Sequence, residues 1–411
     1  LPLGLQHVVA AVVGVITPAI LVADTCGLSS ADKTLMIQVS LILTALATLL
    51  QLFPIFHRIG SGLPVIMGIS FAYIPTLQAI GGEFGLPTIL GAEIVGGIVA
   101  IVFGVLVKWI RPLFPPLVTG TVIFTIGLSL YPTAVKYMAG GAGSEWFGSA
   151  KSWAVALITL AVVVFLNHFT KGITKLASIL IGILAGYVIA YFLGIVDLSG
   201  VGSAAWVALP RPMPFDIQFV PAACVSLGIV YVVNAVQTIG DLSSTTMGGM
   251  DRMPTDKELS GGIVGQGVMS ILGAFFGGLP AATYSQNVGI VTVNRVINRA
   301  VFALAALILL VAGLVPKFAS LLTTIPQCVI GGATISVFAT ITMTGIRMIT
   351  EGGFTPRKSS VVGLSVALGV GITQVSGCLA GEGFPAWVNT VFGSSSVVVA
   401  ALMAILLNLI L

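Results

Sequence analysis

The chain has 411 residues, of which 57% are hydrophobic and only 7% are Asp, Glu, Lys or Arg, with a formal net charge of +4. A soluble domain carries roughly 25% charged residues and needs polar groups over its surface. The composition therefore excludes an ordinary soluble protein and indicates a chain covered largely by lipid. Its four cysteines lack the spacing of a metal or redox site, and no basic cluster indicates nucleic acid.

Membrane spans are the elements that the sequence predicts most clearly, since a bilayer core needs about 20 apolar residues per helix. The chain enters an apolar run at once without a charged leader, so we expect no removable signal peptide. In chain order, apolar stretches predict fourteen spans, at 4–23, 34–53, 63–80, 86–109, 115–133, 152–167, 173–196, 217–246, 260–279, 280–296, 299–314, 325–345, 359–376 and 393–411. We therefore expect an all-α polytopic membrane protein.

Lys and Arg are distributed unevenly among the predicted loops. With the N-terminus placed in the cytoplasm, the cytoplasmic loops hold 12 of the 17 basic side chains. Such a bias sets the orientation of membrane proteins. It predicts an even number of spans, a multi-pass protein of the cell's inner or plasma membrane, and both termini in the cytoplasm.

The two halves of the predicted chain are almost equal in length and face opposite ways. Seven spans end near Asp197 and seven more begin near Ile217. The sequence Gly-Leu-Pro opens the third span at 62–64 and the tenth span at 278–280. These features predict a 7+7 inverted repeat, which is common among secondary transporters.

The third and tenth spans are short, polar and interrupted, at 67–76 and 283–295. Irregular backbone at membrane depth survives only beside a cavity, so matching broken spans indicate a transporter's binding site. We expect each to be a short extended strand that leads into a half-helix, with the two N-termini near the middle of the membrane. Their free N–H groups would attract electron-rich or anionic substrate atoms.

Four segments resemble motifs of the nucleobase–ascorbate transporter family. Residues 286–295 begin Gln-Asn-Val-Gly and are similar to its signature, while Gln6-His7 resembles its first-span Gln-His pair. Residues 70–72 (Ser-Phe-Ala) resemble its third-span strand, and 237–241 (QTIGD) its eighth-span motif. The resemblance covers nearly the whole chain.

The resemblance implies a fold of core and gate domains. The core domain would comprise 1–109 (spans 1–4) and 217–314 (spans 8–11), and the gate domain 110–197 (spans 5–7) and 315–411 (spans 12–14). It further implies a substrate between spans 3 and 10, an elevator-like motion of the core, and a homodimer. Family members carry nucleobases with a proton, or ascorbate with sodium.

Two carboxylates of the family pattern are replaced here by amides, at Gln237 and Gln266, and its signature Thr falls on Asn294. Gln286 at the head of the signature resembles the purine-carrying branch, since uracil carriers tend to have Glu there. This favours xanthine or urate over uracil.

A side-chain amide has one acceptor and one NH2 donor, so it can form two hydrogen bonds to the edge of a purine dione. Phe71 could stack on the flat ring. We expect backbone N–H groups of residues 71, 72, 285 and 286 to take part. The expected substrate-binding residues are Phe71, Ala72, Gln237, Ser285, Gln286 and Asn287, supported by Gln6, Ser70, Gln266 and Gly289.

Each assignment has a structural alternative. Gln286 and Asn287 could satisfy the broken backbone, Gln237 could bond between helices, and Phe71 would be a core residue without the resemblance.

Asp241 lies one helical turn beyond Gln237, and His7 sits in the first span. We expect these two to lie close behind the substrate and to bear ion coupling, or else to brace one another. The other carboxylate within the spans, Glu93, is expected to face the bundle interior as a paired structural residue. The charged run 251–258 is expected to be a solvated loop.

The sequence therefore predicts secondary active uptake of a purine base, without a cofactor or metal and with no catalytic residue. A proton or sodium would be co-transported. Uracil uptake, or an anion carrier or channel on the same architecture, are the alternatives. An enzyme is disfavoured because no nucleophile, metal cluster or phosphate loop rises above chance.

Overall fold

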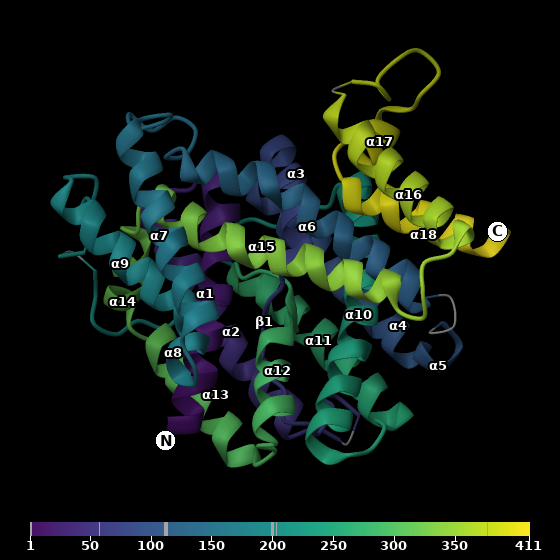
Figure 1. Ribbon diagram of the computed structural model, residues 1–411, viewed down its shortest axis with the longest axis horizontal. Coiled ribbons are helices and arrows are strands. Elements are labelled where there is room, and N and C mark those ends of the chain that lie inside the picture. The colour runs from purple at the N-terminus through teal and green to yellow at the C-terminus, as the bar shows by residue number, and fades with distance from the viewer. Residues whose placement is uncertain (1, 57, 111–113, 199–200, 203, 376) are drawn as a thin grey trace.

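The computed structural model describes residues 2–56, 58–110, 114–198, 201–202, 204–375 and 377–411, which fold into a bundle of helices around one short pair of strands (Figure 1). The elements of the first half are α1 (Pro2–Thr25), α2 (Ser30–Leu52), β1 (Met67–Ile69), η1 (Phe71–Tyr73), α3 (Ile74–Phe84), α4 (Leu86–Val105), α5 (Val107–Ile110), α6 (Pro116–Met138), α7 (Ala150–Phe169), α8 (Ile173–Leu176) and α9 (Ser178–Phe192). Those of the second half are α10 (Pro221–Met250), α11 (Asp256–Phe276), β2 (Ala281–Thr283), α12 (Ser285–Asn294), α13 (Arg299–Gly313), α14 (Pro316–Thr323), α15 (Gln327–Thr350), α16 (Pro356–Gln374), α17 (Ala386–Val388), η3 (Asn389–Gly393) and α18 (Ser396–Ile410).

Eight of the described helices are long and apolar enough to cross a membrane, or nine if α13 and α14, bent by 79° at their junction, form one span. The polytopic all-helical prediction is confirmed. The other predicted spans fall on the shorter helices α9 and α18, on α16, and on the two broken segments. Polar and helix-breaking residues interrupt the two broken segments, so no single long helix forms in either of them.

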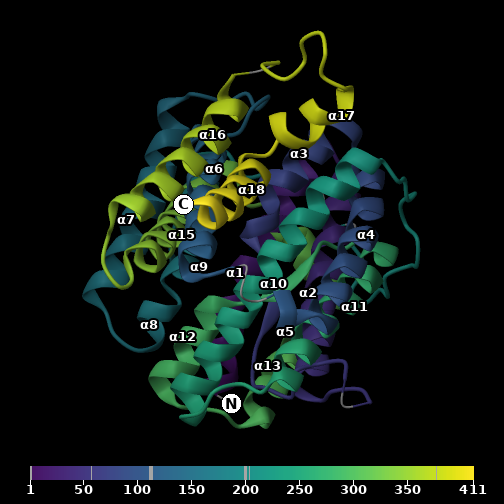
Figure 2. The ribbon, with the colours of Figure 1, turned by 90° about the vertical axis from the view of Figure 1, so that its right-hand side faces the viewer.

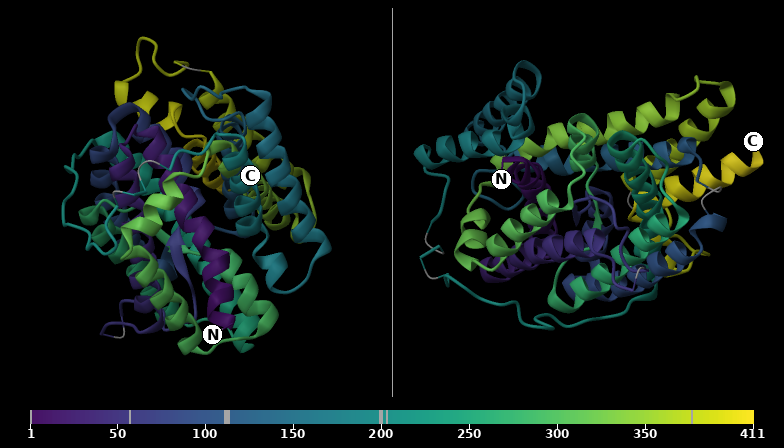
Figure 3. Two further views of the ribbon diagram at one scale, coloured as in Figure 1. Left: turned by 90° about the vertical axis from the view of Figure 1, so that its left-hand side faces the viewer. Right: turned by 90° about the horizontal axis from the view of Figure 1, so that it is seen from below.

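The helices assemble into two groups (Figures 2 and 3). In the first helix group, α4 packs against α10 and α11, α2 packs against α13, and α1 and α12 complete the bundle, with α3 beside α1 and α4. The second helix group consists of α6, α7, α9, α15, α16, η3 and α18, in which α15 lies along α6 and α16 along α18. The short α14 packs on α2 and α13.

Close helix crossings in the second group depend on residues without side chains. A Cβ at Gly127 of α6 would lie 2.1 Å from Thr342 Oγ1 of α15, and one at Gly345 of α15 would lie 2.4 Å from the Phe124 nitrogen of α6. Small residues of this kind let helix backbones approach closely in membranes.

β1 and β2 pair antiparallel in the middle of the first helix group, with Gly68 opposite Ala282. Neighbouring side chains hold this ribbon. Thr48 Oγ1 accepts from the Met67 N–H at 3.0 Å, and the Tyr284 hydroxyl donates to the Ile69 carbonyl at 3.1 Å. Gly68 is required because a Cβ would lie 2.5 Å from the Tyr284 ring. The expected strands in broken spans 3 and 10 are thus confirmed.

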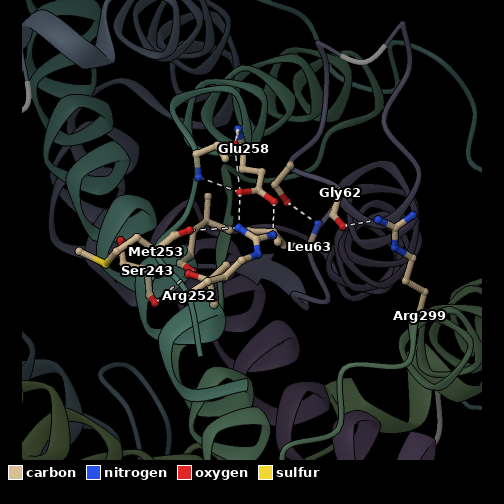
Figure 4. A network of polar contacts seen from close by, with 11 residues as sticks. Gly62, Leu63, Ser243, Arg252, Met253, Glu258 and Arg299 are labelled. Atoms are coloured by element: carbon tan, nitrogen blue, oxygen red, sulfur yellow. Dashed lines mark hydrogen bonds and ion pairs between the residues drawn. The ribbon is translucent and has the colours of Figure 1, made fainter. Parts of the chain in front are cut away.

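A polar network lies at the surface of the first helix group, beside the start of α11 (Figure 4). Arg252 makes two hydrogen bonds to Glu258, at 2.5 and 2.9 Å, and Thr255 with Glu258 forms a capping box that starts α11. Arg299 donates to the Gly62 carbonyl at 2.7 Å, which ties α13 to the segment before β1. The run 251–258 is largely exposed as predicted, although its last three residues form the first turn of α11.

Candidate functional site

The candidate site lies where the two-stranded ribbon passes into helices on either side. Because the strands are antiparallel, η1 and α3 leave one end of the ribbon and α12 leaves the other. Tyr284 at the start of α12 gives no side-chain cap, so the N–H groups of Ser285 and Gln286 have no partner from that side chain or from their own helix. At η1 the Ala72 N–H donates to Ser70 Oγ at 3.1 Å in this structure.

One face of α10 supplies the polar floor of the site. The Asp241 carboxylate accepts hydrogen bonds from Thr283 Oγ1 at 2.6 Å and from Ser285 Oγ at 2.7 Å. Gln237 lies one turn earlier, with Nε2 3.4 Å from Ser285 Oγ, at the limit of hydrogen bonding. Asp241 therefore joins α10 both to β2 and to the first residue of α12.

Behind this floor, the fully buried Gln266 of α11 is the centre of a hydrogen-bond network. Its Oε1 accepts from Thr238 Oγ1 at 2.7 Å, and its Nε2 donates to Asn234 Oδ1 at 2.6 Å and to the Tyr73 hydroxyl at 3.2 Å. Asn234 in turn lies 3.4 Å from Gln237 Oε1. Gln266 thus connects η1, α10 and α11.

His7 and Asp241 belong to different clusters, so the described contacts give no direct bond between them. The Asn287 Nδ2 lies 3.0 Å from His7 Nδ1 and donates to the His7 carbonyl at 3.1 Å. The His7 ring packs on Phe302 with centroids 4.4 Å apart. Asn287 is buried and faces α1, so among the residues expected to bind substrate it serves as a brace between α12 and α1.

An accessible polar face runs along α12 from the site. Ser285, Gln286 and Gly289 are exposed, as is Gly240 on the neighbouring α10. A Cβ at Gly240 or at Gly289 would meet no atom within 4 Å, so both glycines border open space. Gln286 and the half-exposed Gln237 reach this face directly.

Phe71 closes the opposite edge of the site. It is 8% exposed and meets Phe338 of α15 edge to face, with ring centroids 5.4 Å apart. The aromatic contact therefore lies at the boundary between the two helix groups. Of the supporting residues, Ser70 caps η1, and Gln6 is buried near the start of α1.

Glu93 of α4 is buried as expected, but the expectation that it is paired is wrong. Both of its carboxyl oxygens lack a hydrogen-bond partner among the described residues. α4 packs against α10 and α11, which bring the Tyr231 ring close to Gly96 and the Gly273 backbone close to Glu93 Oε1.

Asn234 and Thr238 of α10 were not predicted from the sequence, although Gln237 and Asp241 beside them were. Asn234, Gln237 and Asp241 with Thr238 recur every three or four residues of α10, a polar stripe that could have revealed the network.

A second unpredicted cluster surrounds Asp24, which accepts from the Tyr137 hydroxyl at 2.6 Å and from Gln327 Nε2 at 2.5 Å and pairs with Lys33. It borders a cavity of about 880 Å³ between the two helix groups. The two uncharged partners come from α6 and α15, too far away in the sequence to be inferred.

The fold and the site define a class, that of polytopic membrane transporters with a site at two broken helices. The chain belongs to the xanthine and uric acid permease family: a family model described as "Permease family" matches residues 1–377. It is a membrane permease of this family and not an enzyme.

Individual proteins support the family and the fold. The chain is 35% identical over 418 residues to the xanthine permease of Bacillus subtilis, covering 100% of this chain and 93% of that protein. It is 35% identical over 419 residues to the uric acid permease PucK of the same species, covering 99% and 94%. The fold matches the inward-facing structure of the murine anion transporter Slc26a9 with a TM-score of 0.67 at 11% identity, covering 100% and 68% of the two chains.

Proposed function

We propose that this protein is a secondary active transporter that takes up a purine base such as xanthine or urate. The observation that carries the proposal is the accessible polar face at the ribbon, where Gln237, Ser285 and Gln286 converge from α10 and α12. A flat purine dione offers N–H donors beside carbonyl acceptors, and these side chains offer the complementary groups. Uracil, which has the same edge on a smaller ring, is the alternative base.

The contacts of the bound base follow from this placement. Gln286 and Gln237 would bond the polar edge of the ring, while the first N–H groups of α12 would face a carbonyl oxygen. Phe71 would stack against one ring face beside Ala72. Ser285 would touch the base while it remains bonded to Asp241, so substrate and carboxylate share one hydroxyl. Asn287 would hold α12 against α1 rather than bind the base.

The proposed architecture is fourteen spans in a 7+7 inverted repeat, with both termini cytoplasmic. The first helix group would form most of the core domain (1–109 and 217–314) and the second the gate domain (110–197 and 315–411), except that α14 of the latter range packs on α2 and α13. Phe71 and Phe338 meet at the boundary of the groups, where sliding of one past the other would move a bound base. We further propose an elevator motion, a homodimer joined through gate domains, and an address in the plasma membrane.

The coupling ion is proposed to be a proton, with sodium as the alternative. Asp241 is the candidate nearest the base, because one hydroxyl separates them. His7 is the second candidate and would act through Asn287.

Uptake of radiolabelled xanthine, urate, guanine and uracil into proteoliposomes tests this function. Saturable uptake of a purine, competed by unlabelled purine, is the expected result. Absence of saturable uptake for every base would reject it. Runs with an inward pH gradient and with a sodium gradient identify the ion.

An anion carrier is the second candidate function. The helix N-termini of η1–α3 and α12 both meet the ribbon, and such termini attract negative charge. The fold is also that of a protein described as an anion transporter. Chloride- or sulfate-dependent currents that purines do not block would favour this function.

A further inference from the structure

Glu93 is a buried acid that the proposed substrate site does not use. It is 0% exposed on α4, and neither of its oxygens has a hydrogen-bond partner among the described residues. Removing an ionised carboxylate from water without a partner costs several kcal/mol even after relaxation. In this arrangement the side chain is therefore neutral and holds its proton.

The described side chains packed near Glu93 include two phenols, which cannot neutralise a carboxylate. The rings of Tyr73 (η1) and Tyr231 (α10) lie 4.8 Å apart, and Tyr231 packs on α4 one turn from Glu93, where a Cβ at Gly96 would lie 2.2 Å from its ring. On the α11 side, a Cβ at Gly273 would lie 3.4 Å from Glu93 Oε1, so that helix presents bare backbone. The ion pairs of the described chain do not include Glu93.

A route connects this acid to the substrate site. The Tyr73 oxygen accepts from Gln266, which leaves the Tyr73 hydrogen free to bond another acceptor. Gln266 continues through Asn234 to Gln237 at the accessible face. If Glu93 lost its proton, its carboxylate would attract the hydroxyl hydrogen of Tyr73. The same phenol helps to position the Gln266 network, so ionisation at Glu93 would disturb the side chains that hold the base.

We propose that Glu93 is a proton-binding site of the transport cycle, protonated when the base is bound and deprotonated after the base has left. The step forms one O–H bond on a carboxyl oxygen with a proton from water and later breaks it, with no change of oxidation state. A neutral Glu93 lets the first helix group cross the membrane region without an unpaired charge. This inference rests on the proposed function and adds a second acid to Asp241.

The test compares binding of labelled xanthine or urate by the full chain, as a function of pH, in the parent protein and in Glu93→Gln. Where the free protein has lost its proton, the parent's affinity should fall about tenfold per pH unit, since proton and base bind together. Glu93→Gln mimics the neutral acid, so the part of the pH dependence that Glu93 contributes should be lost and its affinity at high pH should exceed the parent's. Base-induced proton uptake in weak buffer should fall by one proton per bound base in this variant. Glu145→Gln, which removes an exposed acid in a loop, is the matched control.

The outcomes separate the two proposals. A parent protein that binds and transports no base rejects the proposed function. A parent that binds base with proton uptake, while Glu93→Gln keeps the same pH dependence and proton uptake, overturns the role of Glu93 alone. Should Glu93→Gln not be recovered in folded form, Tyr73→Phe carries the test. It removes the connecting hydroxyl and should flatten the pH dependence, and an unchanged curve would overturn the proposal.

Discussion

The two sides of the boundary between the helix groups differ in how they are held. On the α3 side, towards which α3 runs from the ribbon, polar bonds cross directly from one group to the other. Asp24 bonds Tyr137 and Gln327, and Thr76 bonds Ser395 at 2.8 Å. On the α12 side, the described ion pairs stay inside the first helix group, as Arg252–Glu258 and Arg295–Asp251 do.

Because of this difference, the two sides of the boundary give unequal access to the candidate site. On the α3 side, bonds between the groups border a cavity of about 880 Å³, whereas the α12 side exposes Ser285, Gln286 and Gly289. With the proposed cytoplasmic termini, the accessible side is the cytoplasmic one. The proposed inverted repeat would therefore hold two similar broken segments in unequal surroundings, and the proposed transport cycle would reverse that inequality.

The largest expected effect comes from Asp241→Asn on the accessible side. A pH gradient of about two units can drive about 100-fold accumulation by a one-proton symporter, because each unit is worth about 1.4 kcal/mol. The variant should lose this accumulation, since the amide cannot ionise, but should still exchange bound base. Proteoliposome uptake with and without a preloaded base measures both. Unchanged accumulation would show that Asp241 only braces Ser285 and Thr283.

Gln286→Ala should weaken purine binding by about 10- to 100-fold, because up to two hydrogen bonds to the base are lost. Gln374→Ala removes an exposed amide at the end of α16 and is the matched control. Equilibrium binding of labelled base gives the ratio. Equal affinities for the two variants would place the base away from α12.

The strands, the half-helices and the residues at the ribbon could be predicted from the sequence, because broken, polar segments are unusual within an apolar span. The Asp24 cluster could not be predicted, because the partners Tyr137 and Gln327 lie 113 and 303 positions away in the chain. The prediction that Glu93 is paired followed from the rule that buried charges have partners. The rule does not apply to a neutral acid. The lack of a partner for Glu93 among the described residues is a property of the three-dimensional structure.

Asp24→Asn should loosen the α3 side. Charge-assisted hydrogen bonds contribute about 1.5–3 kcal/mol each, so losing the charge should raise the minor, α3-side-open population about tenfold or more. Ser395→Cys, in a chain whose other cysteines are replaced, reports this opening because Ser395 is 1% exposed and faces Thr76. Its labelling by an impermeant maleimide should accelerate accordingly. Asp32→Asn removes a nearby half-exposed charge that, among the described residues, bonds Ser29 within the first helix group, and it should leave the rate unchanged.

The smallest effect is expected at Arg252, on the accessible side. Exposed ion pairs contribute roughly 0–1 kcal/mol, and this pair joins α11 to its own preceding loop rather than to the second helix group. Arg252→Ala should therefore change neither the labelling of Ser395→Cys nor uptake, and should lower thermal stability only slightly. A labelling change as large as that of Asp24→Asn would mean that polar contacts within one group also set the conformation. If Asp24→Asn accelerates labelling and Arg252→Ala does not, the bonds that cross between the groups are what holds the two groups together on the α3 side.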